Sequence, residues 1–360
     1  MTDAHDSTAV VIGAGPAGCA VAIGLARTGV SVTLVEKKDF PRVKVCGEYI
    51  SPAGTESLER VVSPEELIAA GGRRVNSMAL ELGDRVIEWR TPRPAWCLSR
   101  KSLDELLRDR ARAAGVEVRQ PVSVRDVEYA DDGVSVRTDC GAIAADFVVH
   151  ADGSGRFDPA GPTPMAAGVV GVKCHYRAAE PVVGVRMRAC AGGYVGTVGV
   201  EGGLATCAAV VRTDAIKRST GNIDAAVRTL WPGWDAGSRE SEWLSCGVAR
   251  TVYQEPGHAR SVRIGNAAAA VDPVGGEGIG LALWSAARFI DGFDGAVVSA
   301  KRSLAAAYRR RLRVRRWACW GAAEALMRPG LVRAVWPVLG RRGEGSAAMG
   351  AWYRLSGKMG

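Results

Sequence analysis

The sequence predicts an α/β fold, with one domain built on a parallel sheet, a second built on an antiparallel sheet, and a helical C-terminal region. Residues 9–36 read as strand, glycine turn, helix and strand, while residues 167–255 contain alternating valine-rich runs typical of antiparallel strands. An arginine-rich helical pattern runs from Lys301 to Arg316. With 360 residues, 47% of them hydrophobic, the chain can bury a core of this size.

The first element is a short apolar run at residues 9–12, typical of a buried parallel strand, and a GxGxxG motif follows it directly. Gly13 is expected to make the tight turn, Gly15 to let the backbone approach a pyrophosphate, and Gly18 to let helix pack on strand. The helix that follows presents its first N–H groups, including that of Ala17, to the phosphates.

A second strand at residues 31–35 ends on Glu36, and Lys37 follows. The carboxylate of Glu36 is expected to accept hydrogen bonds from the ribose hydroxyls of an adenosine, which argues against a 2′-phosphate there. Lys37 is a further candidate contact. Strand, motif, helix, strand and acid together predict a dinucleotide site, and the alternative is a glycine turn with a purely structural role.

Two distant segments complete this pattern. Residues 147–154 form an apolar strand that ends in a turn containing Asp152 and Gly153. Residues 262–280 combine Asn266 with a glycine-rich loop, and a helix is expected from Ile279 to Ile290. The alternative for this loop is a glycine turn before a packed helix.

These segments resemble the signatures of FAD-dependent oxidoreductases related to p-hydroxybenzoate hydroxylase, most closely the geranylgeranyl-reductase branch, over residues 8 to about 290. The resemblance implies a Rossmann-like FAD-binding domain of the glutathione-reductase type, with FAD as cofactor. It places Gly276, Gly278 and Ile279 beside the flavin. Asn266 stands where the family has an aspartate that bonds a ribityl hydroxyl. An amide keeps the acceptor but loses the charge, so we expect weaker FAD binding.

A third matching stretch surrounds Arg100. Ser99 or Ser102 is expected to cap a helix whose apolar positions are 103, 106 and 107. The resemblance implies that Arg100 touches the cofactor, and the alternative is a solvated arginine in the first turn.

The loop at residues 40–52 resembles the KxCGE..SP loop that runs alongside the flavin ring in the reductase family. Cys46 beside Lys44 is expected to have a lowered pKa and to donate a proton or orient substrate, although free cysteines are often small buried hydrophobes. Glu48 is the competing acid–base candidate, with a pKa raised by desolvation; a capping or salt-bridging role is the alternative. No catalytic role is assigned to any histidine.

The resemblance also bears on the substrate. Tyr194, in an expected turn at residues 192–196, stands where geranylgeranyl reductases carry a YxWxFP element, of which only the tyrosine is present. Tyr194 is therefore a candidate substrate contact, and isoprenoid specificity is left open. The WxWxIP motif of flavin halogenases is missing, which argues against halogenation. Gly343–Gly345 follows a basic loop rather than a strand, so NAD(P)H is expected only as a transient external donor.

The expected domains are interleaved along the chain. The FAD-binding domain comprises residues 1–71, 96–166 and 256–300, the substrate domain 72–95 and 167–255, and the C-terminal helical region 301–360.

The net charge of +9 is concentrated in the C-terminal region, from Arg309 to Arg316. There Leu304, Tyr308, Leu312 and Trp317 are expected to form an apolar stripe that packs on the core, and the alternative is peripheral attachment to an anionic membrane. No recognition motif for nucleic acid accompanies the charge.

Other features of the composition concern location and metals. Nine scattered cysteines without a CxxC pair predict neither disulfides nor a metal site, and they fit a cytoplasmic location. No leader peptide and no transmembrane segment is expected.

The function expected from the sequence is FAD-dependent reduction of a carbon–carbon double bond in a small hydrophobic molecule, isoprenoid- or polyketide-like. A monooxygenase of specialised metabolism, either a hydroxylase or an epoxidase, is the close alternative. A non-catalytic flavin- or lipid-binding protein is the second.

Overall fold

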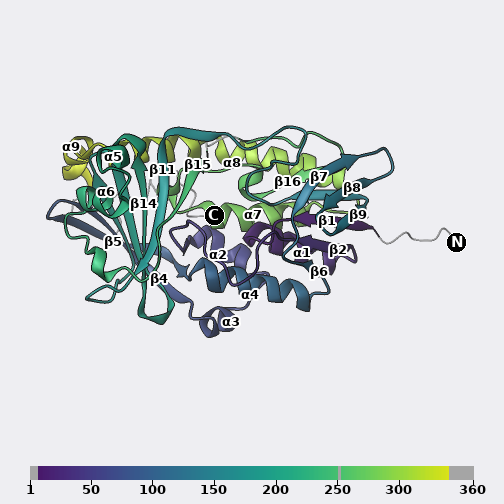
Figure 1. Ribbon diagram of the computed structural model, residues 1–360, viewed down its shortest axis with the longest axis horizontal. Helices are drawn as coiled ribbons and strands as arrows, with labels where there is room; N and C mark the ends of the chain where they lie inside the picture. The colour runs from purple at the N-terminus through teal and green to yellow at the C-terminus, as the bar shows by residue number, and fades with distance from the viewer. Residues whose placement is uncertain (1–6, 250–252, 340–360) are drawn as a thin grey trace.

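The computed structural model describes residues 7–249 and 253–339, and within them three sheets are flanked by helices. The parallel sheet lies toward one end of an elongated molecule and a large, mostly antiparallel sheet at the other (Figure 1). The predicted α/β fold class is confirmed.

The parallel sheet has the strand order β16-β10-β1-β2-β6. Its strands are β1 (Thr8–Ile12), β2 (Ser31–Val35), β6 (Glu117–Arg119), β10 (Phe147–His150) and β16 (Ser261–Arg263). The central strand β1 pairs in parallel with β10 on one side and β2 on the other. Since both faces of β1 are covered, its residues are almost all apolar.

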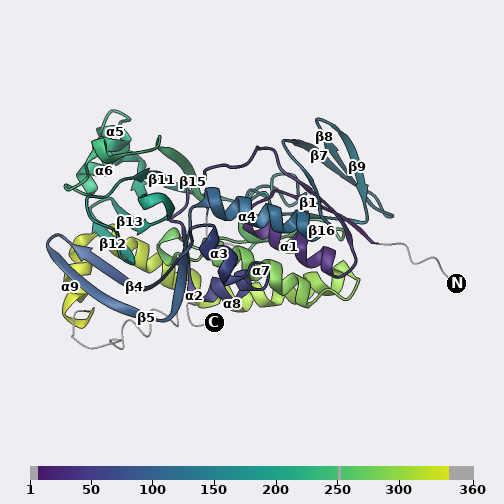
Figure 2. The ribbon, with the colours of Figure 1, turned by 90° about the horizontal axis from the view of Figure 1, so that it is seen from below.

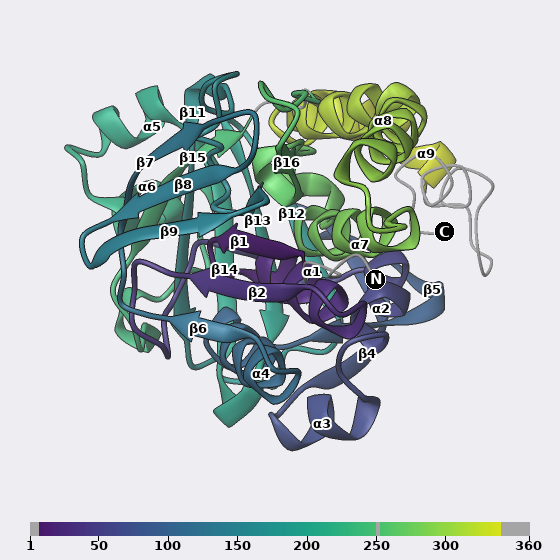
Figure 3. The same ribbon diagram turned by 90° about the vertical axis from the view of Figure 1, so that its right-hand side faces the viewer.

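Helices and a small sheet cover opposite faces of this parallel sheet (Figure 3). On one face lie α1 (Pro16–Arg27), α4 (Arg100–Ala113) and α7 (Gly278–Asp291), and on the other the three-stranded sheet of β7 (Val124–Tyr129), β8 (Val134–Thr138) and β9 (Gly141–Ala145). Alternate residues of β1 serve the two layers: Val11 packs with the helices and Val10 with the small sheet. The helix expected after the glycine turn and the one expected at residues 279–290 correspond to α1 and α7.

The larger sheet has the order β15-β11-β14-β13-β12-β4-β5-β3. Its strands are β3 (Tyr49–Ile50), β4 (Arg73–Leu82), β5 (Arg85–Cys97), β11 (Met165–Tyr176), β12 (Val185–Cys190), β13 (Gly193–Gly199), β14 (Ala205–Arg212) and β15 (Leu244–Ala249). All pairs are antiparallel except β12 with β4, where Val185 lies opposite Met78 in a parallel pair.

The turn expected around Tyr194 is wrong, because this residue lies inside strand β13. Tyr194 and Val195 pair with Val210 and Ala209 of β14. Both residues have the side chains that pleated, half-buried strands favour, and this preference outweighs the turn tendency of the neighbouring glycines.

Six further helices connect or cover these sheets: α2 (Pro52–Glu59), α3 (Pro64–Ala69), α5 (Thr213–Arg218), α6 (Ile223–Leu230), α8 (Val297–Leu326) and α9 (Pro329–Leu339). Four short 3-10 turns accompany them: η1 (Glu201–Gly203), η2 (Ala236–Ser238), η3 (Gly265–Ala267) and η4 (Pro273–Gly275). No helix in the described part of the chain is long and apolar enough to span a bilayer.

The expected C-terminal helix is present as α8, and three of its four predicted core residues are buried. Leu304, Tyr308 and Leu312 face inward, whereas Trp317 is 62% exposed, so its assignment to the stripe is wrong. The buried residues 304, 308 and 312 are spaced by four and share one side of the helix. Trp317 follows Leu312 by five residues and therefore lies on another side, and Cys319 takes the inward position. Gly343–Gly345 lies outside the described residues.

Candidate active site

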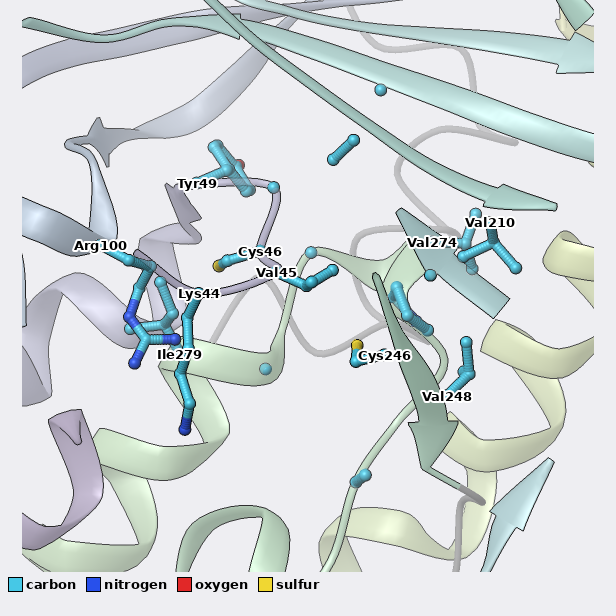
Figure 4. A pocket seen from close by; sticks show the side chains of 18 of the residues that line it. Lys44, Val45, Cys46, Tyr49, Arg100, Val210, Cys246, Val248, Val274 and Ile279 are labelled. Carbon is cyan, nitrogen blue, oxygen red and sulfur yellow. The ribbon is translucent and has the colours of Figure 1, made fainter. Parts of the chain in front are cut away.

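A cavity of about 310 Å³ lies between the first turns of α1 and α7 and one face of the larger sheet (Figure 4). It brings together nine of the residues singled out from the sequence: Gly15, Ala17, Cys46, Arg100, Tyr194, Asn266, Gly276, Gly278 and Ile279. Six others do not line it: Gly13, Gly18, Glu36, Lys37, Glu48 and Asp152.

The glycines of the first turn have different tasks. Gly13 has φ of 101°, and a Cβ there would lie 2.8 Å from the carbonyl oxygen of Ala151. A Cβ on Gly18 would lie 1.8 Å from the carbonyl oxygen of Gly13, so helix and turn can touch only without it. Gly15 is different, because its Cβ would meet only an Arg100 nitrogen at 3.9 Å. Gly15 therefore presents bare backbone to the cavity.

Glu36 is buried beside this turn. One carboxylate oxygen accepts the N–H of Ala14 at 3.0 Å and the other that of Lys38 at 3.0 Å, and Arg42 Nη2 lies 3.2 Å away. Lys37 is exposed to solvent. The acid thus stabilises the glycine turn next to it, and its contact with an adenosine stays a prediction.

Asp152 stabilises the turn after β10. Its side chain accepts hydrogen bonds from the N–H of Gly155 at 3.0 Å and from the hydroxyl of Ser154. The cavity wall itself is formed by its neighbours Ala151 and Gly153.

Arg100 supplies a fixed cation at the start of α4, where Ser99 accepts the N–H of Ser102 as the predicted cap. Its guanidinium donates two hydrogen bonds of 2.7 Å to the two carboxylate oxygens of Asp104. Burial disfavours this charge, but Asp104 outweighs it and raises the pKa of Arg100. Figure 4 shows Arg100 and Lys44 extending in parallel along one side of the cavity.

Two helix N-termini face the cavity. Gly15 caps α1 and Glu277 caps α7, and neither helix has a side-chain hydrogen bond at its cap. Gly276, with φ of 61°, leads the chain into α7. Uncapped N–H groups at two helix ends beside a fixed arginine make a site for anionic groups, and bare glycine backbone lets such groups approach closely. The residues present therefore fit the anionic pyrophosphate of FAD.

Cys46 lines the cavity opposite Cys246 (Figure 4). Its sulfur accepts the N–H of Glu48 at 3.3 Å. The lowered pKa that the sequence predicts for this thiol is wrong: burial raises the pKa, and this effect outweighs the nearby cation of Arg100. Cys46 therefore carries its proton at neutral pH.

Glu48 lies behind the cavity wall, fully buried, in a cluster of donors. One carboxylate oxygen accepts hydrogen bonds from Lys173 Nζ at 2.6 Å and from the backbone N–H of Arg100 at 2.8 Å. The other lies 2.7 Å from His175 Nε2 and also accepts a hydrogen bond from the Thr206 hydroxyl. The expected rise in its pKa is wrong. Burial does raise it, but the hydrogen bond from His175 and the charge of Lys173 together lower the pKa to about 2. Glu48 is thus a buried carboxylate that joins the loop at residues 40–52 to α4 and to the larger sheet.

Sequence reasoning missed the partners of this carboxylate. Lys173 and His175 lie two residues apart in β11, on one face of an otherwise apolar strand. Two polar residues at strand spacing in a valine-rich run were the available signal. Thr206 in β14 carried no such signal.

Tyr194 contacts the loop before α7. Its hydroxyl donates to a carboxylate oxygen of Asp272 at 2.7 Å, and that same oxygen accepts the N–H of Val274 at 3.0 Å. Burial raises the pKa of both Tyr194 and Asp272. Tyr194 therefore connects β13 of the larger sheet to the loop before α7.

Comparison with known proteins identifies the family. Residues 6–321 match the family described as FAD binding domain, and the chain belongs to it. The menaquinone reductase of Mycolicibacterium smegmatis is 30% identical over 304 residues, which is 76% of this chain and 73% of that protein. The tryptophan 2-halogenase of Chondromyces crocatus is 29% identical over 155 residues, which is 40% of this chain and 30% of that protein.

Solved structures share the fold. A flavoprotein/dehydrogenase from Cytophaga hutchinsonii has a TM-score of 0.80 at 19% identity, covering 97% of this chain and 92% of that one. A geranylgeranyl bacteriochlorophyll reductase-like protein from Thermoplasma acidophilum has a TM-score of 0.79 at 17% identity, covering 97% and 96%. The chain is an FAD-dependent oxidoreductase, in line with the predicted resemblance to the p-hydroxybenzoate hydroxylase superfamily.

Proposed function

We propose that this enzyme reduces a carbon–carbon double bond in a small hydrophobic substrate, isoprenoid- or polyketide-like, with NAD(P)H as a transient external electron donor. The observation that carries the proposal is the apolar wall facing Cys46. It consists of Val172, Val185, Met187, Val198, Val210 and Val248 from the larger sheet. Such a wall favours a hydrocarbon over a polar substrate and excludes water from the reacting carbons. The name of the menaquinone reductase relative also favours a reductase.

The chain's residues have separate tasks in this reaction. FAD, when bound, supplies the hydride. The N-termini of α1 and α7 and the guanidinium of Arg100 bind its anionic groups. The valines orient the double bond, and Tyr194 closes one side of the cavity.

Cys46 holds the proton that the reaction also needs. Reduction adds a hydride to one carbon and a proton to the other, and the neutral thiol donates that proton from Sγ. The thiolate that remains is stabilised by the N–H of Glu48 at 3.3 Å and by the nearby charge of Arg100. A proton from solvent then restores the thiol.

The test is an anaerobic experiment with the FAD-loaded protein. After reduction with NADPH, a panel of isoprenoid and polyketide-like alkenes is added, flavin absorbance is followed, and products are identified by mass spectrometry. We expect reoxidation that depends on the alkene and a product richer by two hydrogen atoms. Cys46→Ala should slow this step about 100-fold or more while leaving reduction by NADPH unchanged. Product that forms only with dioxygen and contains an added oxygen atom would establish a monooxygenase instead.

A further inference from the structure

Helix α8 sorts its arginines onto two faces. Arg311 and Arg315 face inward, where both interact with the carboxylate of Glu277 and Arg311 lies 4.5 Å from the ring centre of Trp284. Arg310 and Arg313 face outward and are exposed. The inner arginines are accounted for by packing against the protein, whereas the outer ones point to solvent.

Large apolar side chains are exposed beside the outer arginines. On α8 these are Trp317 at 62%, Trp320 at 56% and Val314 at 46%, and on α9 they are Leu331 at 50% and Val335 at 47%. Residues 314, 317 and 320 share one side of the helix, and the rings of Trp317 and Trp320 meet edge to face with centres 6.2 Å apart. Figures 1 and 2 both place α9 beside the C-terminal part of α8. We call these five residues, with Arg310 and Arg313, the α8–α9 face.

This face is strongly cationic. Residues 297–323 contain no aspartate or glutamate. Arg309 forms an ion pair with Glu255, but across residues 7–249 and 253–339 no carboxylate pairs with Arg310 or Arg313. Cations placed around exposed tryptophans are complementary to an anionic surface that has an apolar interior.

We propose that the α8–α9 face binds the surface of a lipid bilayer that contains anionic lipids. Tryptophan rings prefer the boundary between headgroups and acyl chains, and each arginine near an anionic membrane contributes about 1 kcal/mol. The two contributions together give peripheral binding without a spanning helix. A second copy of the chain fits less well, because a two-fold contact through this face would bring its arginines against one another.

The inner side of α8 touches the glycine-rich loop before α7. Cys319 Sγ lies 3.0 Å from the position of a Cβ on Gly275, and Gly276 lines the cavity. A bilayer on the α8–α9 face would therefore lie roughly one helix diameter, about 10 Å, from the cavity wall. This short distance between bilayer and cavity suits a hydrophobic substrate that is taken from the membrane. Only this statement about the substrate rests on the proposed function.

The test measures binding of the FAD-loaded protein to vesicles by sedimentation. We expect binding to vesicles of phosphatidylcholine with phosphatidylglycerol, little binding to pure phosphatidylcholine, and release at high salt. Arg310→Gln with Arg313→Gln should lower the partition coefficient about 30-fold, because about 2 kcal/mol is lost. Trp317→Ser with Trp320→Ser should lower it at least as much. Far-ultraviolet circular dichroism and FAD content should be unchanged in both pairs.

The matched control variants remove arginines and an apolar side chain from surfaces outside the α8–α9 face. Arg125→Gln with Arg137→Gln removes two exposed arginines from the small sheet, and Ile68→Ser removes an apolar residue that is 60% exposed. Equal losses in these controls would overturn the proposal, as would absence of binding to the anionic vesicles. A dimer that dissociates on Trp317→Ser with Trp320→Ser would also overturn it and assign the face to self-association. Vesicle binding needs no turnover, so its outcome is independent of the double-bond reaction.

Discussion

Replacing Glu48 with glutamine is expected to destabilise the protein by about 3 kcal/mol. Its pKa falls from the ordinary 4.5 to about 2, because the hydrogen bond from His175 and the charge of Lys173 outweigh burial. Each tenfold change in acidity corresponds to about 1.4 kcal/mol, so this difference amounts to roughly 3 kcal/mol. Glutamine keeps the shape but leaves the ammonium of Lys173, 1% exposed, without its counter-charge, which costs about 3–5 kcal/mol in buried pairs.

The assay is urea unfolding of the FAD-loaded protein, followed by circular dichroism, at neutral pH and at a series of acidic values. Because the folded-state pKa of Glu48 is lowered, its contribution is fully present above about pH 4.5 and is lost as the pH falls toward about 2. Across this pH range the free energy of unfolding of the wild type should therefore fall by about 3 kcal/mol more than that of the glutamine variant. The two free energies should become equal at the acid end of the range.

Glu240→Gln is the matched control, since Glu240 pairs with Arg177 at 3.0 Å on the surface, and it should cost less than about 1 kcal/mol. Adding Lys173→Met to Glu48→Gln should restore part of the lost stability, because the unpaired charge is removed. A Glu48→Gln variant within about 0.5 kcal/mol of wild type, with an unchanged acid dependence, would refute the assignment of a buried carboxylate.

Three further substitutions test the cavity. Gly15→Val should leave the fold intact, because the new side chain enters the cavity. It should weaken FAD binding about 100-fold in a fluorescence titration of the apoprotein. An unchanged affinity would contradict the placement of FAD against Gly15. Asn266→Asp should tighten FAD binding about 5-fold in the same titration, because a charged acceptor bonds a hydroxyl more strongly. Tyr194→Phe should destabilise the protein by about 1–3 kcal/mol in urea, because half-buried Asp272 loses its hydroxyl donor. No change in stability would contradict that bond.

The parts of the fold that depend on local sequence were predictable. The apolar run of β1, the glycine turn and the helix α1 follow one another within about twenty residues, so spacing alone specifies them. The parallel pairing of β12 with β4 was not predictable, because it joins strands more than a hundred residues apart. A pairing between such distant strands depends on the tertiary packing of the whole chain, and the local sequence pattern does not predict it.

The candidate site divides in the same way. The sequence drew attention to the loop with Cys46 and Glu48, yet both predicted pKa directions were wrong. Lys173 and His175 lie 125 and 127 residues away from Glu48 in the sequence. The residues next to Glu48 in the sequence therefore do not reveal that these two side chains contact its carboxylate. The arginines of α8 were visible as a cluster, but the contact of Arg311 with Trp284 was not, because Trp284 belongs to a different helix.

The strands of the parallel sheet and of the larger sheet alternate along the chain, and this has a consequence for synthesis on the ribosome. Strand β1 needs β10, β16 and the covering helix α7, which ends at residue 291. At roughly 5–20 residues per second, the apolar residues of β1 wait about 15–60 s for these partners. During that interval the nascent chain exposes unpaired strand edges, the surfaces that chaperones shield. Expression together with a ribosome-associated chaperone is therefore expected to raise the yield of folded protein.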